Sequence, residues 1–269
     1  MENLHNISTL LYHETHFSSE ANRPWVLFIH GAGGSTRTWR KQVDAFKENF
    51  NLLLIDLPGH AESKHITIDD RAYTFEWIGS KIWEVVDELR IQDIHIVAVS
   101  LGSIIGMQMQ RLNPKRVVSM VFAGPIVGLN LKLRVLARSG LMLARIIGYH
   151  QFYALTARIA LPKRNHQKSR EVFVKESKRI VAKEYKKWTS MYGKTLDSTI
   201  QVLFGNPPGV PLFFVVGEED HLFMNPALKY QKRFEEVRLE LVEKCGHVVS
   251  IEKAAVFNAL ALRSLLGST

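Results

Sequence analysis

Short apolar runs alternate along the chain with longer segments in which apolar residues recur every three or four positions. The runs are rich in β-branched residues and end at glycine, proline or polar residues, which is typical of parallel strands buried on both faces. They are Trp25–Ile29, Leu52–Ile55, Ile94–Val99, Val117–Phe122, Leu212–Val216 and Val237–Val242. We also expect an antiparallel edge strand at Ile7–Tyr12.

Helical patterns fill the intervals between these runs. Apolar residues of Tyr73–Leu89 fall on one face, and Ser100–Leu112 and Val249–Leu266 are further predicted helices. Asn225 and Pro226 predict the start of another helix, with asparagine as the N-cap and proline at the first helical position. The alternation predicts the α/β class, an open and mostly parallel sheet with helices on both faces.

The middle of the chain interrupts this alternation. Helical patterns lie at Asn130–Tyr149 and His166–Trp188, and no convincing strand occurs from about residue 130 to 205. A segment of this length is too long for an ordinary loop. We therefore predict two parts: a core domain of residues 1–125 and 207–269, and a helical cap at 126–206, inserted after the fourth parallel strand.

The net charge of +9 is concentrated in this middle segment. Residues 125–208 hold 16 Lys and Arg against 4 Asp and Glu, a surplus of +12, whereas the rest of the chain holds 19 basic and 22 acidic residues, a balance of −3. The uneven distribution and the lack of a recognisable motif argue against nucleic acid as a partner. Two interpretations stay open: the charge is the solvated outer face of the cap, or it attracts an anionic substrate, carrier protein or lipid surface.

Composition excludes several kinds of site. The single cysteine excludes a disulfide framework and any multi-cysteine zinc or iron–sulfur site, and the 11 histidines show no HxH or HExxH spacing. We expect neither a metal nor a cofactor.

The sequence lacks the run of roughly 18–20 apolar residues that a membrane-spanning helix needs. Residues 1–20 do not resemble a signal peptide, so the expected location is cytoplasmic.

A serine, an aspartate and a histidine each follow the end of a different predicted strand. Ser100 follows the third run, Asp220 lies just past the fifth, and His247 just past the sixth. The carboxyl ends of parallel strands meet at one edge of a sheet, where ligands bind. A serine hydroxyl becomes nucleophilic when an imidazole accepts its proton, and the imidazole needs a carboxylate to fix its tautomer.

The residues around Ser100 favour a nucleophilic role. Ala98 and Gly102, two positions before and after it, are small enough for the sharp strand-to-helix turn of a nucleophile elbow. Ser100 also begins a predicted helix, whose unpaired N–H groups point toward developing negative charge. The glycine loop at Gly31–Gly34 offers a second N–H donor.

Together these features resemble the α/β-hydrolase superfamily. The matching segments are His30-Gly31-Ala32-Gly33-Gly34, Asp56-Leu57-Pro58-Gly59-His60-Ala61-Glu62-Ser63, Ala98-Val99-Ser100-Leu101-Gly102, Gly217-Glu218-Glu219-Asp220 and Cys245-Gly246-His247. The helical insertion sits where the family carries its cap, or lid. The resemblance implies that Ser100 is the nucleophile, His247 the general base and acid, and Asp220 the orienting carboxylate.

The resemblance also implies an oxyanion hole formed by the backbone N–H groups of Ala32 and Leu101. Ala98, Ala61 and Ser103 stand where such sequences commonly have glycine, and none of these changes removes a reacting group. Three acids compete with Asp220 for its role: Glu218, Glu219 and Asp56.

The remaining histidines of these motifs and the cysteine are expected to have no chemical role. His30 and His60 are predicted to hold the glycine loop and a neighbouring turn. His221 is expected to take no part, although it adjoins Asp220, because neighbouring loop residues rarely face one site. Cys245 is predicted to be a small buried hydrophobic residue.

We expect a serine hydrolase that cleaves a carboxylic ester, or alternatively a thioester, through an acyl-enzyme intermediate. The motifs leave open a carbon–carbon bond hydrolase, an acyltransferase, a haloperoxidase-like activity and a ligand receptor that retains the triad, because specificity depends on the cap. The expected substrate is a small ester or acyl compound, with an anionic or lipid-like one as an option, and the basic cap is a candidate for peripheral membrane contact. An apolar acyl pocket is predicted to be lined by Phe152, Tyr153, Trp188, Met191 and Tyr192.

Overall fold

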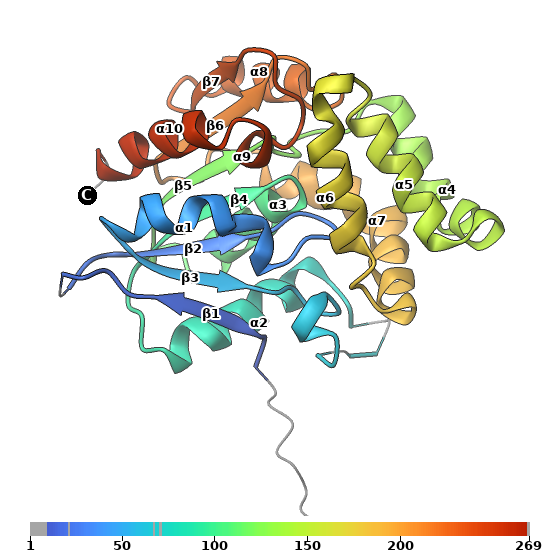
Figure 1. The fold of residues 1–269 in the computed structure, drawn as a ribbon. Helices are drawn as coiled ribbons and strands as arrows, with labels where there is room; N and C mark the ends of the chain where they lie inside the picture. The colour runs from blue at the N-terminus through green and yellow to red at the C-terminus, as the bar shows by residue number, and fades with distance from the viewer. Residues whose placement is uncertain (1–9, 21, 67, 70–71, 268–269) are drawn as a thin grey trace, which may run out of the picture.

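Seven strands form one sheet in the part of the chain that the computed structural model describes, residues 10–20, 22–66, 68–69 and 72–267. Their spatial order is β1-β3-β2-β4-β5-β6-β7, with β1 antiparallel to β3 and all other neighbours parallel. The predicted α/β class and mostly parallel sheet are confirmed. The strands are β1 His13–His16, β2 Trp25–Ile29, β3 Asn51–Ile55, β4 Ile94–Val99, β5 Val117–Ala123, β6 Leu212–Gly217 and β7 Arg238–Val242 (Figure 1).

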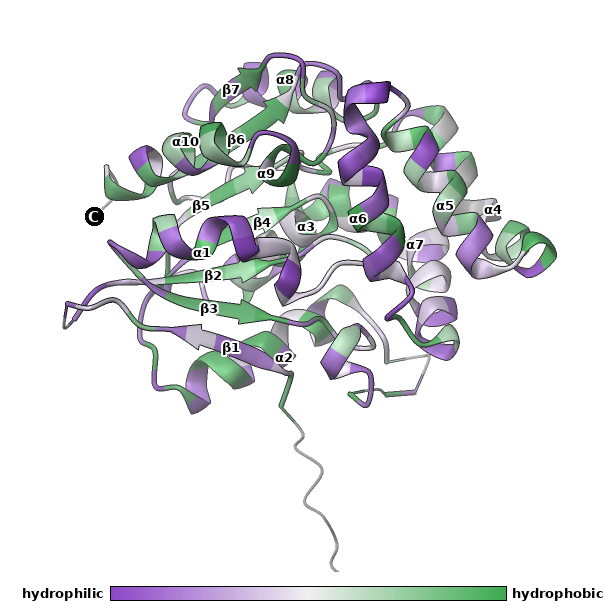
Figure 2. Ribbon diagram, viewed as in Figure 1, coloured by the Kyte–Doolittle hydropathy of each residue, from purple (hydrophilic) through white to green (hydrophobic). Residues whose placement is uncertain are grey.

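Apolar packing on both faces explains why the central strands have continuous apolar sequences. In β2, Leu27 and Ile29 belong to one core cluster, and Val26 and Phe28 belong to another on the opposite face. Figure 2 shows that the central strands are mostly hydrophobic and that the covering helices also carry hydrophilic residues. Helices α2 Phe75–Glu88, α3 Leu101–Leu112 and α8 Met224–Arg233 contribute to the first cluster, together with α7 Ala182–Leu203, and helices α1 Arg40–Lys47, α9 Val249–Glu252 and α10 Ala254–Leu266 contribute to the second.

The antiparallel edge strand lies later than predicted. Of the predicted segment Ile7–Tyr12, residues 7–9 lie outside the described residues, and Leu10–Tyr12 precede the strand. Strand β1 is formed by His13–His16, which pair with Leu52–Ile55 of β3 through the backbone. All four side chains are polar and half-buried, so the strand has no apolar pattern to reveal it.

The segment between β5 and β6 forms four α-helices, which we call the inserted helices. They lie beyond the carboxyl ends of the parallel strands, at the edge of the sheet where α3 begins (Figure 1). The placement of this segment is consistent with the predicted helical cap, and the division into core and cap stays a prediction. The inserted helices are α4 Leu131–Ile147, α5 Tyr149–Ala160, α6 Gln167–Ser177 and α7 Ala182–Leu203.

Two predicted helices are each broken in the structure. The predicted helix His166–Trp188 is divided between α6 and α7 at residues 178–181, where Ile180 turns into an apolar cluster that includes Phe152 and Tyr185. The predicted C-terminal helix is divided at Lys253, whose backbone φ of −129° and ψ of 51° are not helical. Its first part is α9, Val249–Glu252.

Helix α8 begins at Met224, so Asn225 and Pro226 lie within its first turn and are not its N-cap and first residue. The start of this helix is fixed from outside, because the Asp220 carboxylate accepts the N–H groups of Leu222 and Phe223 just before it. No helix among the described residues has both the length and the apolar character needed to cross a bilayer.

Candidate active site

Ser100 occupies the sharp turn between β4 and α3. Its backbone φ of 53° and ψ of −118° are uncommon for a residue other than glycine, and such strain is concentrated at functional turns. The turn requires Gly102, because a Cβ at that position would lie 2.5 Å from the Ile29 carbonyl oxygen. This is the local geometry that the nucleophile-elbow pattern predicts.

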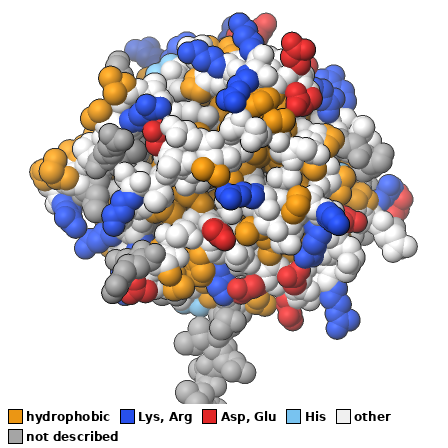
Figure 3. Space-filling model, turned by 180° about the vertical axis from the view of Figure 1, so that it is seen from behind, with side chains coloured by type: hydrophobic (Ala, Val, Ile, Leu, Met, Phe, Trp, Pro, Cys, Tyr) orange, Lys and Arg blue, Asp and Glu red, His pale blue; other side chains and the backbone are white. Residues whose placement is uncertain are grey.

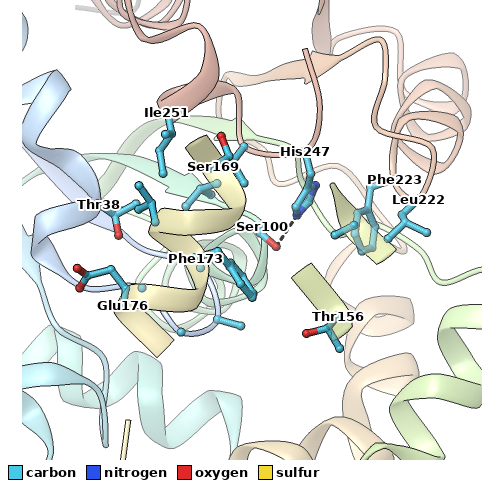
Figure 4. Close-up of a pocket in the computed structure, with 18 of the residues that line it drawn as sticks. Thr38, Ser100, Thr156, Ser169, Phe173, Glu176, Leu222, Phe223, His247 and Ile251 are labelled. Carbon is cyan, nitrogen blue, oxygen red and sulfur yellow. Dashed lines mark hydrogen bonds between the residues drawn. The ribbon is translucent and has the colours of Figure 1, made fainter. Parts of the chain in front are cut away.

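Ser100, His247 and Asp220 lie in one hydrogen-bonded chain. His247 Nε2 is 2.8 Å from Ser100 Oγ, and His247 Nδ1 is 2.7 Å from Asp220 Oδ2 (Figure 4). Because an ionised carboxylate only accepts hydrogen bonds, Nδ1 carries the imidazole proton and Nε2 is free to accept one from the hydroxyl. The loops after β4, β6 and β7 thus bring together the three side chains that the sequence singled out.

Asp220 is fully buried and its second oxygen is also bonded. Oδ1 accepts the N–H groups of Leu222 at 3.2 Å and Phe223 at 3.1 Å. Burial acts to raise the pKa of Asp220, but His247 and these hydrogen bonds outweigh it and hold the pKa below its ordinary value. Asp220 is therefore ionised at neutral pH. The ring of Phe223 packs against the His247 imidazole at a centroid distance of 4.8 Å.

The three competing acids lie elsewhere. Asp56 is buried and accepts the backbone N–H groups of Thr36 at 2.7 Å and Glu62 at 3.0 Å, and burial raises the pKa of its carboxyl. Glu219 faces the inserted helices and accepts a hydrogen bond from His166 Nε2 at 2.8 Å. Glu218 is exposed.

Two buried histidines hold the glycine loop, as predicted. His30 Nδ1 donates to the Gly31 carbonyl at 2.7 Å, and its Nε2 accepts the Leu57 N–H at 3.0 Å. His60 Nδ1 donates to the Pro58 carbonyl at 3.1 Å, and its Nε2 accepts the Gly33 N–H at 3.2 Å. Burial lowers the pKa of His60 to about 4 and that of His30 well below its ordinary value, so both rings are neutral.

The predicted oxyanion donors flank this loop and the elbow. Leu101 is the first residue of α3, so its N–H has no acceptor within the helix. Ala32 lines the same cavity as Ser100. The assignment of both N–H groups to an oxyanion hole stays a prediction.

Ser103, one of the three departures from glycine, has a defined contact of its own. Its buried hydroxyl donates to the Ser100 carbonyl at 2.7 Å and accepts the Ile126 N–H at 3.1 Å. The side chain therefore ties the elbow to the chain that leaves β5. Ala98 is fully buried in β4, and Ala61 has a positive φ of 41°, the conformation that favours glycine.

His221 and Cys245 contribute nothing visible to this site. The His221 side chain is exposed. Cys245 is buried and unpaired, and burial raises the pKa of its thiol to about 12, which makes it unreactive at neutral pH. Within the described residues, no group of three or more His, Cys, Asp or Glu is arranged to hold a metal ion.

Glu252 is a member of the site that sequence reasoning missed. Its carboxylate accepts the Gly246 N–H at 2.9 Å and the Val248 N–H at 3.3 Å, on both sides of His247. His166 Nε2 lies 3.8 Å from the same carboxylate. The available signal was an acid five positions after the histidine, in the first turn of the predicted helix Val249–Leu266.

Two adjoining cavities lie between the sheet edge and the inserted helices. The first, ≈ 190 Å³, contains Ser100 and His247 on its wall and is otherwise largely apolar (Figure 4). The second, ≈ 210 Å³, shares Leu133, Phe173 and Phe223 with the first. Of the predicted pocket residues, three line the second cavity: Phe152, Tyr153 and Tyr192.

Trp188 and Met191 line neither cavity, which corrects the prediction. Both are buried and pack in the main core cluster, and Trp188 Nε1 donates to the Pro58 carbonyl at 3.0 Å. These two residues attach α7 to the core.

The basic surplus of the inserted helices lies outside the cavities. Figure 3 shows Lys and Arg side chains among exposed apolar ones on the side of the molecule that carries these helices. None of the described Lys or Arg residues lines either cavity. Lys175, Lys178 and Lys183 are exposed, whereas Arg179 pairs with Glu62 and Glu176. Most of the described Lys and Arg side chains of residues 125–208 are exposed, which agrees with both interpretations of this charge.

Comparison with known sequences identifies a family. Residues 24–254 match the family described as alpha/beta hydrolase fold. The RutD protein of Acinetobacter baylyi, provisionally named a carbamate hydrolase, is 30% identical over 91 residues, 34% of each chain. The 2-succinyl-6-hydroxy-2,4-cyclohexadiene-1-carboxylate synthase of Klebsiella pneumoniae is 32% identical over 84 residues, 31% of each chain. The chain thus spans about a third of the length of these relatives.

Solved structures extend the similarity to nearly the whole chain. A carboxylesterase of Nitrososphaera gargenis superposes with a TM-score of 0.77 at 18% identity, covering 96% of this chain and 94% of the other. The enol-lactonase of Burkholderia xenovorans LB400 gives a TM-score of 0.79 at 17% identity, with 95% and 96% covered. At such identities the likeness establishes the fold.

Proposed function

Because the chain belongs to the alpha/beta hydrolase fold family, we propose that it is a serine hydrolase whose substrates are carboxylic esters, with thioesters as a second class. The hydrogen-bonded chain from Asp220 through His247 to Ser100 is the observation that carries this proposal. A largely apolar cavity against Ser100 supplies room for an acyl group.

In the first half of the reaction, Ser100 Oγ attacks the acyl carbon while its proton moves to His247 Nε2. The carbonyl oxygen becomes an oxyanion next to the Leu101 and Ala32 N–H groups, where the amino end of α3 favours negative charge. His247 then gives the proton to the departing alkoxide oxygen, the carbon–oxygen bond breaks, and an acyl ester remains on Ser100.

In the second half, water replaces the alcohol. His247 accepts a proton from water as the water oxygen attacks the acyl carbon, and it returns that proton to Ser100 Oγ when the carboxylic acid leaves. Asp220 stabilises the imidazolium in both halves. Its low pKa suits this role, because the carboxylate stays ionised while His247 takes up and releases protons.

The rival functions of this fold differ in what they require of Ser100. A ligand receptor that keeps the triad would react once and release product very slowly, whereas a hydrolase turns over repeatedly. A carbon–carbon bond hydrolase or an acyltransferase would use the same cavity with a different substrate or acceptor. Ester hydrolysis needs only water as the second reactant, and we take it as the primary activity.

The test is a reactive fluorophosphonate label followed by a panel of p-nitrophenyl esters from acetate to dodecanoate. We expect mass spectrometry to place the label on Ser100, no label on Ser100→Ala, and repeated turnover of at least one ester. Label on another residue, or a single burst without turnover, would contradict the proposal.

A further inference from the structure

Helix α6 presents a stripe of four residues to the cavity that holds Ser100. They are spaced as on one helical face, and all four line the cavity: Ser169, Val172, Phe173 and Glu176. Two of them are polar, in a cavity whose other walls are mostly apolar. Figure 4 shows Phe173 on the side of this helix toward Ser100 and His247, and Glu176 on its other side near Thr38, which also lines the cavity.

Glu176 is a buried acid with one oxygen left for a ligand. Only 8% of the residue is exposed. Its Oε2 accepts the Ser35 hydroxyl at 2.7 Å and lies 3.4 Å from Arg179. Both bonds involve Oε2, and the other oxygen, Oε1, has no hydrogen bond or ion pair within the described residues.

Arg179 does not cancel the charge of this wall. Its guanidinium also pairs with Glu62, so two carboxylates share one cation and the group keeps a net charge of −1. Glu176 and His247 are the only titratable groups among the described residues that line the cavity. The wall is therefore acidic although the surrounding helices are basic.

Ser169 adds a second unsatisfied polar group. It is fully buried, and its hydroxyl has no hydrogen-bond partner within the described part of the chain. Buried polar groups are nearly always bonded, so this hydroxyl is a second polar group of α6 whose hydrogen-bonding capacity is unmet beside the cavity.

We propose that Glu176 is a specificity determinant that selects substrates carrying a hydrogen-bond donor, preferably an ammonium group, in the part that fills this cavity, and rejects substrates with a second carboxylate there. The inference rests on the proposed function for the reacting end of the substrate. In a cavity of low dielectric constant, a carboxylate attracts a cation strongly and repels another anion, which also loses its hydration. An anionic substrate, one of the options read from the basic sequence, is the least suited to this cavity.

The test uses three ethyl esters with the same six-carbon acyl chain, which end in a methyl, an ammonium and a carboxylate group: ethyl hexanoate, ethyl 6-aminohexanoate and monoethyl adipate. For the wild type we expect kcat/KM for the ammonium ester to exceed that for the carboxylate ester by at least about tenfold. Glu176→Gln should reduce this ratio by about tenfold. Lys175→Gln, one position away on the exposed face, is the matched control and should leave the ratio unchanged.

A binding measurement separates this inference from the proposed function. Ser100→Ala and the double variant Ser100→Ala, Glu176→Gln are titrated calorimetrically with the same three esters, which remain intact. A Glu176-dependent preference for the ammonium ester supports the inference even if no ester is hydrolysed, in which case only the proposed function fails. Equal treatment of the ammonium and carboxylate esters, failure of all three to bind, or a ratio that Glu176→Gln leaves unchanged, overturns the inference whether or not esters are cleaved.

Discussion

Glu219 and Asp220 are adjacent in the chain, yet their carboxylates contact different histidines. Asp220 Oδ2 lies 2.7 Å from His247 Nδ1, and Glu219 Oε2 lies 2.8 Å from His166 Nε2. Hydrogen bonds from Asn165, Lys163 and His166 outweigh the small effect of burial and lower the pKa of Glu219 to about 2, so this acid fastens the start of α6 to the core. One acid thus faces the reacting groups and its neighbour faces the inserted helices.

The first prediction separates these two acids. Asp220→Asn should lower kcat by roughly 10⁴-fold, because an amide favours the wrong imidazole tautomer and cannot stabilise the imidazolium. Glu219→Gln keeps the size of the side chain and should stay within about tenfold of the wild type. Steady-state ester hydrolysis measures both. The opposite ranking would place the orienting acid one residue earlier.

Ser100→Ala should abolish ester turnover and leave the fold intact. Loss of a triad nucleophile typically costs on the order of 10⁶ in kcat. Alanine is smaller than serine and lacks only its hydroxyl group, so the substitution leaves the packing of β4 and α3 unchanged. Activity and thermal unfolding are measured on the same preparation, with Ser103→Ala as a buried serine control that should retain labelling at Ser100. Turnover within tenfold of the wild type by a folded Ser100→Ala protein would eliminate Ser100 as nucleophile.

Glu252→Gln should lower kcat by about 10–100-fold with little change in KM. The carboxylate holds the N–H groups on both sides of His247, and an amide can accept only one of the two bonds without presenting a donor to the other. Glu243→Gln, an exposed acid in the same loop region, is the control and should behave as the wild type. If the loss fell on KM and spared kcat, Glu252 would have a role other than positioning His247.

Stability should fall as the pH drops from about 6.5 toward 4. His60 is buried and neutral with a pKa of about 4, whereas in the unfolded chain it titrates near 6.5, so the unfolded state binds more protons in this window. The titration of this one residue should lower the free energy of unfolding by about 3 kcal/mol between pH 7 and pH 4. Urea unfolding at several pH values measures the effect.

His60→Gln is the matched variant for the stability prediction. An amide oxygen can still accept the Gly33 N–H, but it does not titrate. The variant should be less stable at pH 7 and show a shallower dependence on pH between 6.5 and 4. An equal slope in both proteins would show that folding does not lower the pKa of His60, which would contradict the prediction.

Sequence reasoning located Ser100, His247 and Asp220 because each follows an apolar run that could be recognised as a strand. It could not find Glu176, because the packing of α6 against α5 and α9, and not a local pattern, places this residue at the cavity. The basic residues around Glu176 made α6 look like a solvated helix. The position of strand β1 was predicted wrongly for a related reason. Its pairing with β3 uses the backbone and leaves polar side chains half-buried. Features fixed by tertiary packing have no local pattern.

The neighbouring strands β5 and β6 are connected through residues 124–211, although a parallel pair needs only a crossover of ten or so residues. The entropy lost in closing a loop grows only with the logarithm of its length, so about three doublings cost ~2 kcal/mol. The sheet therefore tolerates a long or a short connection nearly equally well. If Glu176 selects substrates and Ser100, Asp220 and His247 react with them, as proposed, the helix that carries Glu176 can be exchanged during evolution while the loops after β4, β6 and β7 stay unchanged. Selectivity and reaction chemistry are then free to diversify separately.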